Sequence, residues 1–274
     1  MLAHSIVKLE TSRPSHYMIF LHGILGTRAN WRGIARSFVK ARPDWGGILV
    51  DLREHGDSLR QPPPHTLKTT AAGVRELEQA LSLPVRGAVG HSFGGKVALE
   101  WLAMRDDAAE IWLIDSSPGP KATDEGSSVT ASVLMTLERL NRNWPSREAF
   151  VQSIVEAGQP EPIAQWLAMN LNRNDDGSHS FGPDLSAIRS LIEDYAKTDL
   201  WPTVESPPVG STIHLVIGGR SSVFSRLDRA RAEAVAARDP RVFVHIFEAA
   251  GHWVHIDSTE ELVALLTSAA GERR

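Results

Sequence analysis

Cysteine is absent from this chain of 274 residues. Its absence excludes disulfides, thiolate metal sites and a cysteine nucleophile. A strong excess of charge of one sign is also lacking, since the formal net charge is −4. This balance gives no electrostatic reason to expect a nucleic acid or an anionic membrane as a partner.

Long apolar runs are missing as well. No stretch approaches the roughly 20 residues that span a bilayer, and the opening segment MLAHSIVKLE lacks the basic and apolar regions of a secretory signal. We therefore expect a cytoplasmic protein without a membrane partner. Hydrophobic residues make up 42% and charged residues 23% of the chain, which is ordinary globular usage. The length fits one α/β domain with an insertion, or two small domains.

Short apolar runs alternate with longer helical patterns along the chain. Continuous apolar runs are typical of strands buried on both faces of a parallel sheet, and the alternation favours a doubly wound α/β fold. The expected strands are 17–21, 47–50, 85–89, 111–114, 213–217 and 242–247, with 5–10 as an antiparallel edge strand; the expected helices are 31–40, 67–81, 94–104, 224–237 and 259–269.

The stretch from Pro118 to Pro208 interrupts this alternation. It shows no clear strand, and prolines punctuate its ends. Amphipathic helical patterns cover 128–140, 147–157, 161–171 and 185–195. We interpret the stretch as a helical lid over residues 118–208, inserted into a core domain formed by residues 1–117 and 209–274.

The strongest chemical signal is a G-x-S-x-G motif formed by Gly90, Ser92 and Gly94. The motif follows an expected strand and opens an expected helix, which is the setting of a nucleophile elbow. The helix N-terminus offers amide donors to a developing oxyanion. A chance match is the alternative, but the strand–turn–helix context favours Ser92 as a nucleophile.

A serine nucleophile needs a base, and the chain has eleven histidines. His252 is the best candidate, because it follows the last expected strand and would reach the carboxyl edge of the sheet. His255 is its local rival. His214 and His245 lie inside expected strands, where structural roles are expected.

The oxyanion donors are expected on two segments. Gly23 would let the backbone turn so that the amide of Ile24 points at the site, and the amide of Phe93 directly follows the nucleophile. His22 is expected to support this loop by hydrogen bonding and not to act as the base.

Four motifs together resemble the α/β-hydrolase superfamily in order and spacing, over essentially the whole chain. They are His22-Gly23, the DLREHGDS segment that begins at Asp51, GHSFGG from Gly90, and Gly251-His252. The resemblance implies Ser92 as nucleophile, His252 as base, Ile24 and Phe93 as oxyanion amides, and a lid over 118–208. It also implies that His22, Gly23, Gly90, His91 and Gly94 support the site, and that the segment from Asp51 forms a structural turn.

The triad acid departs from the superfamily's usual position after the penultimate strand. Gly218–Val223 stands there without a carboxylate, and Asp228 is the first acid beyond it. Asp115 ends the strand after the nucleophile helix, and the chain resembles the lid-bearing serine carboxylesterase branch that carries its acid there. Neighbouring strand ends lie roughly 5 Å apart, so Asp115 can reach the same histidine. We favour Asp115 over Asp228.

These residues predict acyl transfer by a Ser-His-Asp triad, with no metal and no organic cofactor. Apolar side chains of the lid predict an apolar cleft and a carboxylic ester of short or medium acyl chain as the small-molecule substrate. Those side chains are Leu134, Met135, Trp144, Trp166, Leu167, Met169 and Trp201. An acyltransferase, a hydrolase of thioester, lactone, amide or carbon–carbon bonds, a cofactor-free haloperoxidase-like side activity and a non-catalytic ligand-binding protein stay open. The sequence predicts no oligomeric state.

Overall fold

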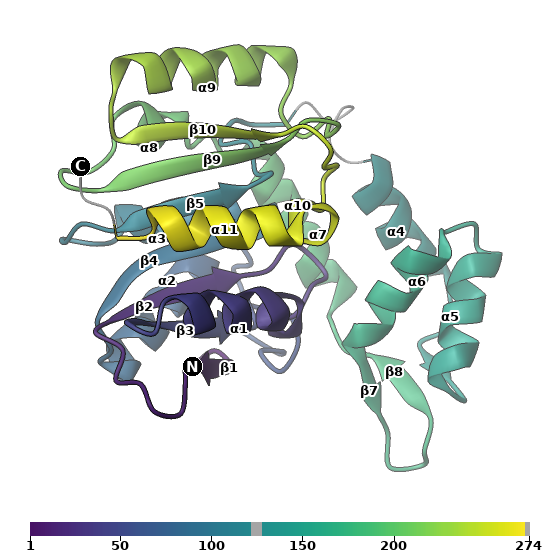
Figure 1. Cartoon of the computed structure of the whole chain (residues 1–274). Helices are drawn as coiled ribbons and strands as arrows, with labels where there is room; N and C mark the ends of the chain where they lie inside the picture. The colour runs from purple at the N-terminus through teal and green to yellow at the C-terminus, as the bar shows by residue number, and fades with distance from the viewer. Residues whose placement is uncertain (122–127, 272–274) are drawn as a thin grey trace.

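The computed structural model describes residues 1–121 and 128–271. Its centre is a seven-stranded sheet in the order β1-β3-β2-β4-β5-β9-β10, parallel except for β1 (Figure 1). The strands are β1 (His4–Val7), β2 (His16–Leu21), β3 (Trp45–Val50), β4 (Val85–His91), β5 (Glu110–Ile114), β9 (Thr212–Gly218) and β10 (Val242–Phe247). The expected doubly wound sheet is confirmed, although the edge strand begins and ends earlier than 5–10.

Alternate residues of the parallel strands enter two separate cores. On β2, Ile19 and Leu21 pack on one face while Met18 and Phe20 pack on the other, as the period of two requires. The first face is covered by α2 (Leu67–Leu81), α3 (Phe93–Ala103) and α9 (Arg226–Arg238), and the second by α1 (Arg32–Ala41) and α11 (Thr259–Ala269). Short helices η1 (Arg28–Trp31) and α10 (Val254–Asp257) precede α1 and α11.

The chain between β5 and β9 carries an insertion. Most of it gathers beyond the tips of the strand arrows, and its last helix returns to the side of the sheet near β9 and β10 (Figure 1). Its helices are α4 (Ser128–Arg139), α5 (Arg147–Glu156), α6 (Glu161–Leu167), η2 (Ala168–Asn170), α7 (Leu185–Lys197) and α8 (Trp201–Glu205). The helix expected over 161–171 therefore ends early. Residues 122–127 of the predicted lid lie outside the described residues.

The expectation that this insertion has no strand is wrong. A small antiparallel sheet in the order β6-β8-β7 joins β6 (Asn143–Trp144), β7 (Leu171–Arg173) and β8 (His179–Phe181). Strands of two or three residues are too short to show an alternating pattern. A tight turn between β7 and β8, closed by the amide of Asn174 on the carbonyl of Ser178 at 2.8 Å, sets their register.

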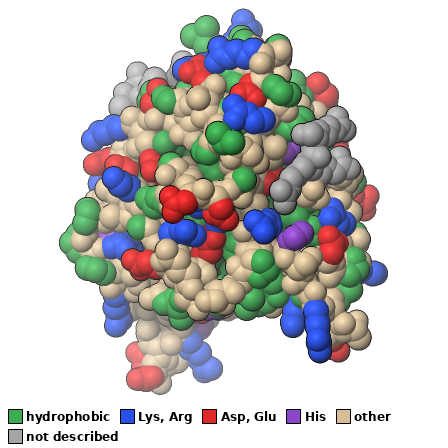
Figure 2. All heavy atoms as spheres, turned by 90° about the vertical axis from the view of Figure 1, so that its left-hand side faces the viewer, with side chains coloured by type: hydrophobic (Ala, Val, Ile, Leu, Met, Phe, Trp, Pro, Cys, Tyr) green, Lys and Arg blue, Asp and Glu red, His purple; other side chains and the backbone are tan. Residues whose placement is uncertain are grey.

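Charges of both signs are spread over the surface at the amino-terminal ends of the parallel strands, opposite the tips of the strand arrows. Figure 2 shows acidic and basic side chains interspersed on this face, without a field of one sign. Within residues 1–121 and 128–271, no helix has both the length and the apolar character needed to cross a bilayer.

Candidate active site

Ser92 occupies the sharp turn between β4 and α3, with φ of +51° and ψ of −114°. A Cβ atom added to Gly90 would lie 2.1 Å from the carbonyl oxygen of Gly94, and one added to Gly94 would lie 2.5 Å from that of Leu21. Both contacts are with backbone and cannot relax cheaply. The two glycines of the motif are therefore what lets strand and helix approach closely enough to present Ser92.

The loop after β2 packs directly against this turn. A Cβ atom added to Gly23 would lie 3.5 Å from Cβ of Ser92 and 2.9 Å from Nδ1 of His91. Ile24 is the next residue of the loop, and Phe93 is the first residue of α3. Within the part of the chain that the structure describes, neither of their amides donates to a protein acceptor. Free backbone donors on segments adjoining a nucleophile are what an oxyanion hole requires.

Two buried histidines hold that loop in place. Nε2 of His22 accepts from the amide of Leu52 at 3.0 Å, and Nε2 of His55 accepts from the amide of Leu25 at 2.9 Å. Leu25 has a left-handed φ of +60°, so the loop needs this support. Burial lowers the pKa of His22 to about 4 and that of His55 to about 3. Both rings are therefore neutral acceptors near neutral pH.

The insertion supplies a further support that the sequence did not reveal. Asn170 is buried at the end of η2, and its Nδ2 donates to the carbonyl of Leu25 at 2.7 Å. The two residues are 145 positions apart in the chain. No local pattern marks such a contact, so only the folded insertion shows that Asn170 holds the loop after β2.

Asp115 and His252 are brought together at the carboxyl end of the sheet. Nδ1 of His252 lies 2.7 Å from Oδ2 of Asp115. The carboxylate is fully buried, whereas the imidazole keeps 38% of its side chain exposed. The amide of Gly218 also donates to Oδ1 of Asp115, at 3.1 Å. This pairing places the proton on Nδ1 and leaves Nε2 without a proton.

Ser221 completes the surroundings of this carboxylate. It stands in the loop after β9, where the acid was missing from the sequence, and its hydroxyl donates to Oδ2 of Asp115 at 2.5 Å. Arg229 on α9 holds the loop by donating to the carbonyls of Gly218 and Ser221 at 2.8 and 2.9 Å. A hydroxyl in this loop thus orients the carboxylate that stands on the neighbouring strand.

Removing that hydroxyl has a measurable consequence. We expect Ser221→Ala to lower kcat for ester hydrolysis by roughly tenfold, because one hydrogen bond to a charged group contributes about 1.5 kcal/mol. The neighbouring Ser222 is exposed, and Ser222→Ala is the matched control, with unchanged kcat. Equal rates for the two variants would show that Ser221 does not orient the carboxylate.

The alternative acid and the alternative base lie elsewhere. Asp228 caps α9, where it accepts from the hydroxyl of Ser225 at 3.0 Å, and it also accepts from Nε1 of Trp201 at 3.3 Å. His255 lies in α10, where its ring is tilted against that of Trp31 with 5.2 Å between the ring centroids. Burial lowers the pKa of His255 to about 4. Neither residue takes part in the pair formed by Asp115 and His252.

His91 links the nucleophile turn to the loop of His252. Its Nε2 donates to the carbonyl of His252 at 3.0 Å, and the two rings lie 4.7 Å apart. Burial, together with the neighbouring imidazoles of His255 and His252, holds the pKa of His91 well below its usual range. The neutral ring therefore links β4 to the loop after β10 by a hydrogen bond.

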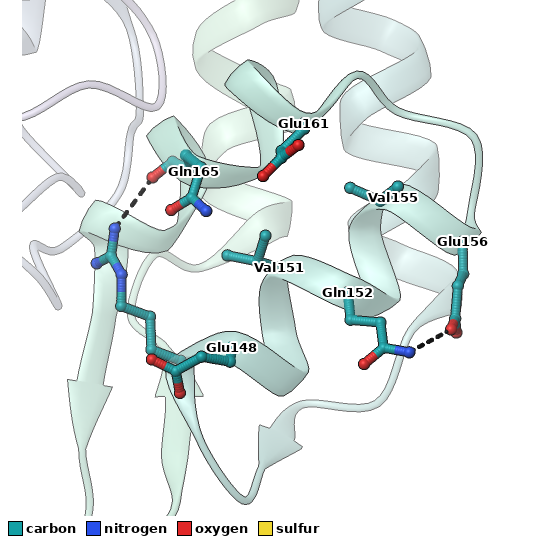
Figure 3. A pocket seen from close by; sticks show the side chains of 8 residues that line it. Glu148, Val151, Gln152, Val155, Glu156, Glu161 and Gln165 are labelled. Atoms are coloured by element: carbon teal, nitrogen blue, oxygen red, sulfur yellow. Dashed lines mark hydrogen bonds between the residues drawn. The ribbon is translucent and has the colours of Figure 1, made fainter.

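One hollow of the molecule lies away from this site. It lies between α5 and α6, measures about 340 Å³ and is lined by Arg147, Glu148, Val151, Gln152, Val155, Glu156, Glu161 and Gln165 (Figure 3). None of these is a candidate catalytic residue. Among the described residues, no cluster of three or more histidine, aspartate or glutamate side chains is placed to hold a metal ion.

Comparison with known proteins gives consistent results. A mouse protein named sn-1-specific diacylglycerol lipase ABHD11 is 27% identical over 276 residues, covering 97% of this chain and 84% of the relative. Esterase YbfF of Escherichia coli is 23% identical, covering 94% of this chain and 95% of the relative. A solved marine microorganism esterase superposes with a TM-score of 0.80 at 20% identity, covering 97% and 98% of the two chains.

The structural match shows the same fold, including an insertion between β5 and β9. Residues 18–265 match the profile described as "Alpha/beta hydrolase family". This range includes the sheet apart from β1 and the first residues of β2, the turn at Ser92 and the loop of His252. The α/β-hydrolase fold expected from the motifs is thereby confirmed, and the chain belongs to the alpha/beta hydrolase family.

Proposed function

We propose that this protein is a serine carboxylesterase in which Ser92 attacks the ester carbonyl and His252 takes the serine proton. Asp115 holds His252 in the required tautomer and stabilises its cation, and the amides of Ile24 and Phe93 bind the oxyanion. Water then releases the acid from the acyl-enzyme. The observation that carries the proposal is the 2.7 Å contact between Nδ1 of His252 and the buried carboxylate of Asp115.

The preference for short or medium acyl chains is supported by the surroundings of His252. Trp253 follows the base, and its ring lies 6.2 Å from that of Trp166 on α6, so apolar rings of core and insertion meet beside the site. The large exposed apolar side chains of the insertion are Met135, Val155 and Met169 among the described residues. They lie on three separate elements and form no continuous face for docking on lipid.

A panel of p-nitrophenyl esters tests this proposal. We expect kcat/KM to rise from acetate to butyrate by up to about fourfold per methylene, the factor that 0.8 kcal/mol per buried CH₂ gives, and to fall at palmitate. A fluorophosphonate probe should label one residue, and peptide mass mapping should place the label on Ser92.

Other outcomes would point elsewhere. Neither turnover nor labelling would indicate a protein that binds a ligand without catalysis. Labelling of Ser92 with product formation only when an alcohol acceptor is present would indicate an acyltransferase. A maximum at palmitate would contradict the expected chain length.

A further inference from the structure

A charged side chain is buried beside the nucleophile turn. Lys96 lies on α3 one turn after Ser92, and its side chain is fully buried. Its ammonium donates to the carbonyls of Gly119, Tyr195 and Thr198 at 2.7, 2.8 and 2.7 Å, which uses all three of its protons. Burying a charge is costly unless hydrogen bonds replace those to water. The three carbonyls are therefore what allows this ammonium to lie in the interior.

The acceptors belong to the two ends of the insertion, which meet at Lys96. One carbonyl lies in the segment that leaves β5, and two lie at the end of α7. Backbone hydrogen bonds also join these segments to each other. The amide of Leu200 donates to the carbonyl of Pro118 at 2.9 Å, and the amide of Lys121 donates to that of Ala196 at 2.8 Å. Lys96 thus fastens both ends of the insertion to the helix that begins next to the nucleophile.

The last turn of α7 is held against the core by further contacts. The carboxylate of Asp194 accepts from the amide of Leu67, the first residue of α2, at 2.7 Å. Nζ of Lys96 lies 4.4 Å from the centroid of the Tyr195 ring, in a cation–π contact. That ring lies 6.0 Å from the ring of Phe93, the first residue of α3. The turn that Lys96 holds therefore packs against the residue that follows the nucleophile.

The ammonium form fits these surroundings. Carbonyl oxygens can only accept, so three of them need three protons from Nζ, whereas a neutral amine supplies two. Burial and the charge of Lys121 lower the pKa of Lys96 to about 7, and the carboxylates of Asp199, Asp228 and Asp194 act in the opposite direction. The cation also lies at the C-terminal end of α7, where the helix dipole stabilises it.

We propose that Lys96 is a positioning residue that fixes both ends of the insertion on the nucleophile helix and thereby holds the insertion's side of the substrate site in place. The inference rests on the proposed function. Aromatic side chains of the insertion meet Phe93 next to the nucleophile and Trp253 next to the base. A loosened insertion therefore weakens the binding of the ester, while the triad, which stands on the core, keeps its geometry.

Lys96→Met removes the three donors and keeps an unbranched side chain in the interior. With p-nitrophenyl butyrate, we expect KM to rise at least about fivefold with kcat within about twofold of the wild type, the pattern of binding energy lost equally from the ground and transition states. Lys96→Gln keeps an amide donor, so its KM should lie between the two. Lys197 is exposed at the end of α7, and Lys197→Met is the matched control, with KM and kcat unchanged.

Hydrogen exchange gives a readout that does not depend on catalysis. In Lys96→Met, the amide of Leu200, which donates to the carbonyl of Pro118, should exchange at least about tenfold faster than in the wild type, because the two ends of the insertion open locally. The amide of Ile19 in the central strand β2 should keep its wild-type rate. Equal acceleration of both amides would show that Lys96 contributes only to global stability and would overturn its positioning role.

The kinetic results can also overturn this role. A folded Lys96→Met variant with KM within about twofold of the wild type, or equal KM values for Lys96→Met and Lys96→Gln, would show that the hydrogen bonds of Lys96 do not hold the substrate site. If Lys96→Met does not fold, Lys96→Gln alone is compared with the wild type. A wild-type protein that neither turns over nor reacts with the fluorophosphonate at Ser92 overturns the proposed function, whereas the exchange rate of Leu200 still decides whether Lys96 holds the insertion.

Discussion

Asp115→Asn should lower kcat by about four orders of magnitude while the protein stays folded. The carboxylate accepts from Nδ1 of His252 at 2.7 Å and is fully buried. A neutral amide cannot stabilise the imidazolium that forms as Ser92 loses its proton. Its NH₂ group would also favour the tautomer that places the proton on Nε2, where the base nitrogen must be free. Rates with p-nitrophenyl butyrate and circular dichroism give the two readouts.

Asp228→Asn is the matched control for this experiment. Asp228 accepts from the amide of Ser225 at 3.3 Å and from its hydroxyl at 3.0 Å in the cap of α9. Asparagine caps helices as well as aspartate does, so we expect kcat within about twofold of the wild type. Loss of activity in this variant with retention in Asp115→Asn would reverse the assignment of the acid.

The parts of the fold that the sequence predicted well are those where one local pattern has one structural solution. A run such as Ile111–Ile114 is apolar at every position because both faces of the sheet are covered, and all of its side chains are buried. The G-x-S-x-G motif carries equally specific information, because Gly90 and Gly94 each meet backbone atoms at distances that exclude any side chain. The positions of the sheet and of Ser92 follow from these patterns.

The parts that escaped prediction depend on contacts between distant segments. Asn170 looks like an ordinary insertion residue in the sequence, and its contact with Leu25 exists only once the insertion has folded against the core. The pairing of Asp115 with His252 was anticipated because parallel strands end at one edge. Its partner Ser221 was not, because a serine in a loop carries no comparable signal.

Acid should unfold this protein well above the pH at which carboxylates titrate. Burial lowers the pKa of His22 to about 4, and that of His55 and His214 to about 3, whereas unfolded histidine titrates near 6.5. Below that pH the unfolded chain binds more protons than the folded one, so the free energy of unfolding falls as pH falls. Each histidine contributes about 1.4 kcal/mol per pH unit, or about 4 kcal/mol per unit for the three.

A domain with an unfolding free energy of about 5–15 kcal/mol loses all of it within a few pH units at this slope, and so unfolds. Urea unfolding between pH 7 and 4.5 should therefore show a nearly constant free energy above about pH 6.5 and a steep fall below it. His214→Phe removes one of these titrating side chains. His214 stacks 3.7 Å from Trp112 in the interior of the sheet, and phenylalanine preserves that stacking without a titrating group.

The variant should lose about 1.4 kcal/mol per pH unit of the acid slope, the contribution of one histidine. It should keep its kcat at pH 7, because His214 lies on β9 away from the loop that carries Ser221. A wild-type free energy that stays constant from pH 6.5 down to 5 would show that the buried rings accept protons without unfolding. In that case His22 and His55 could not be obligate neutral acceptors for the amides of Leu52 and Leu25, and the loop after β2 would have to be held by Asn170 instead.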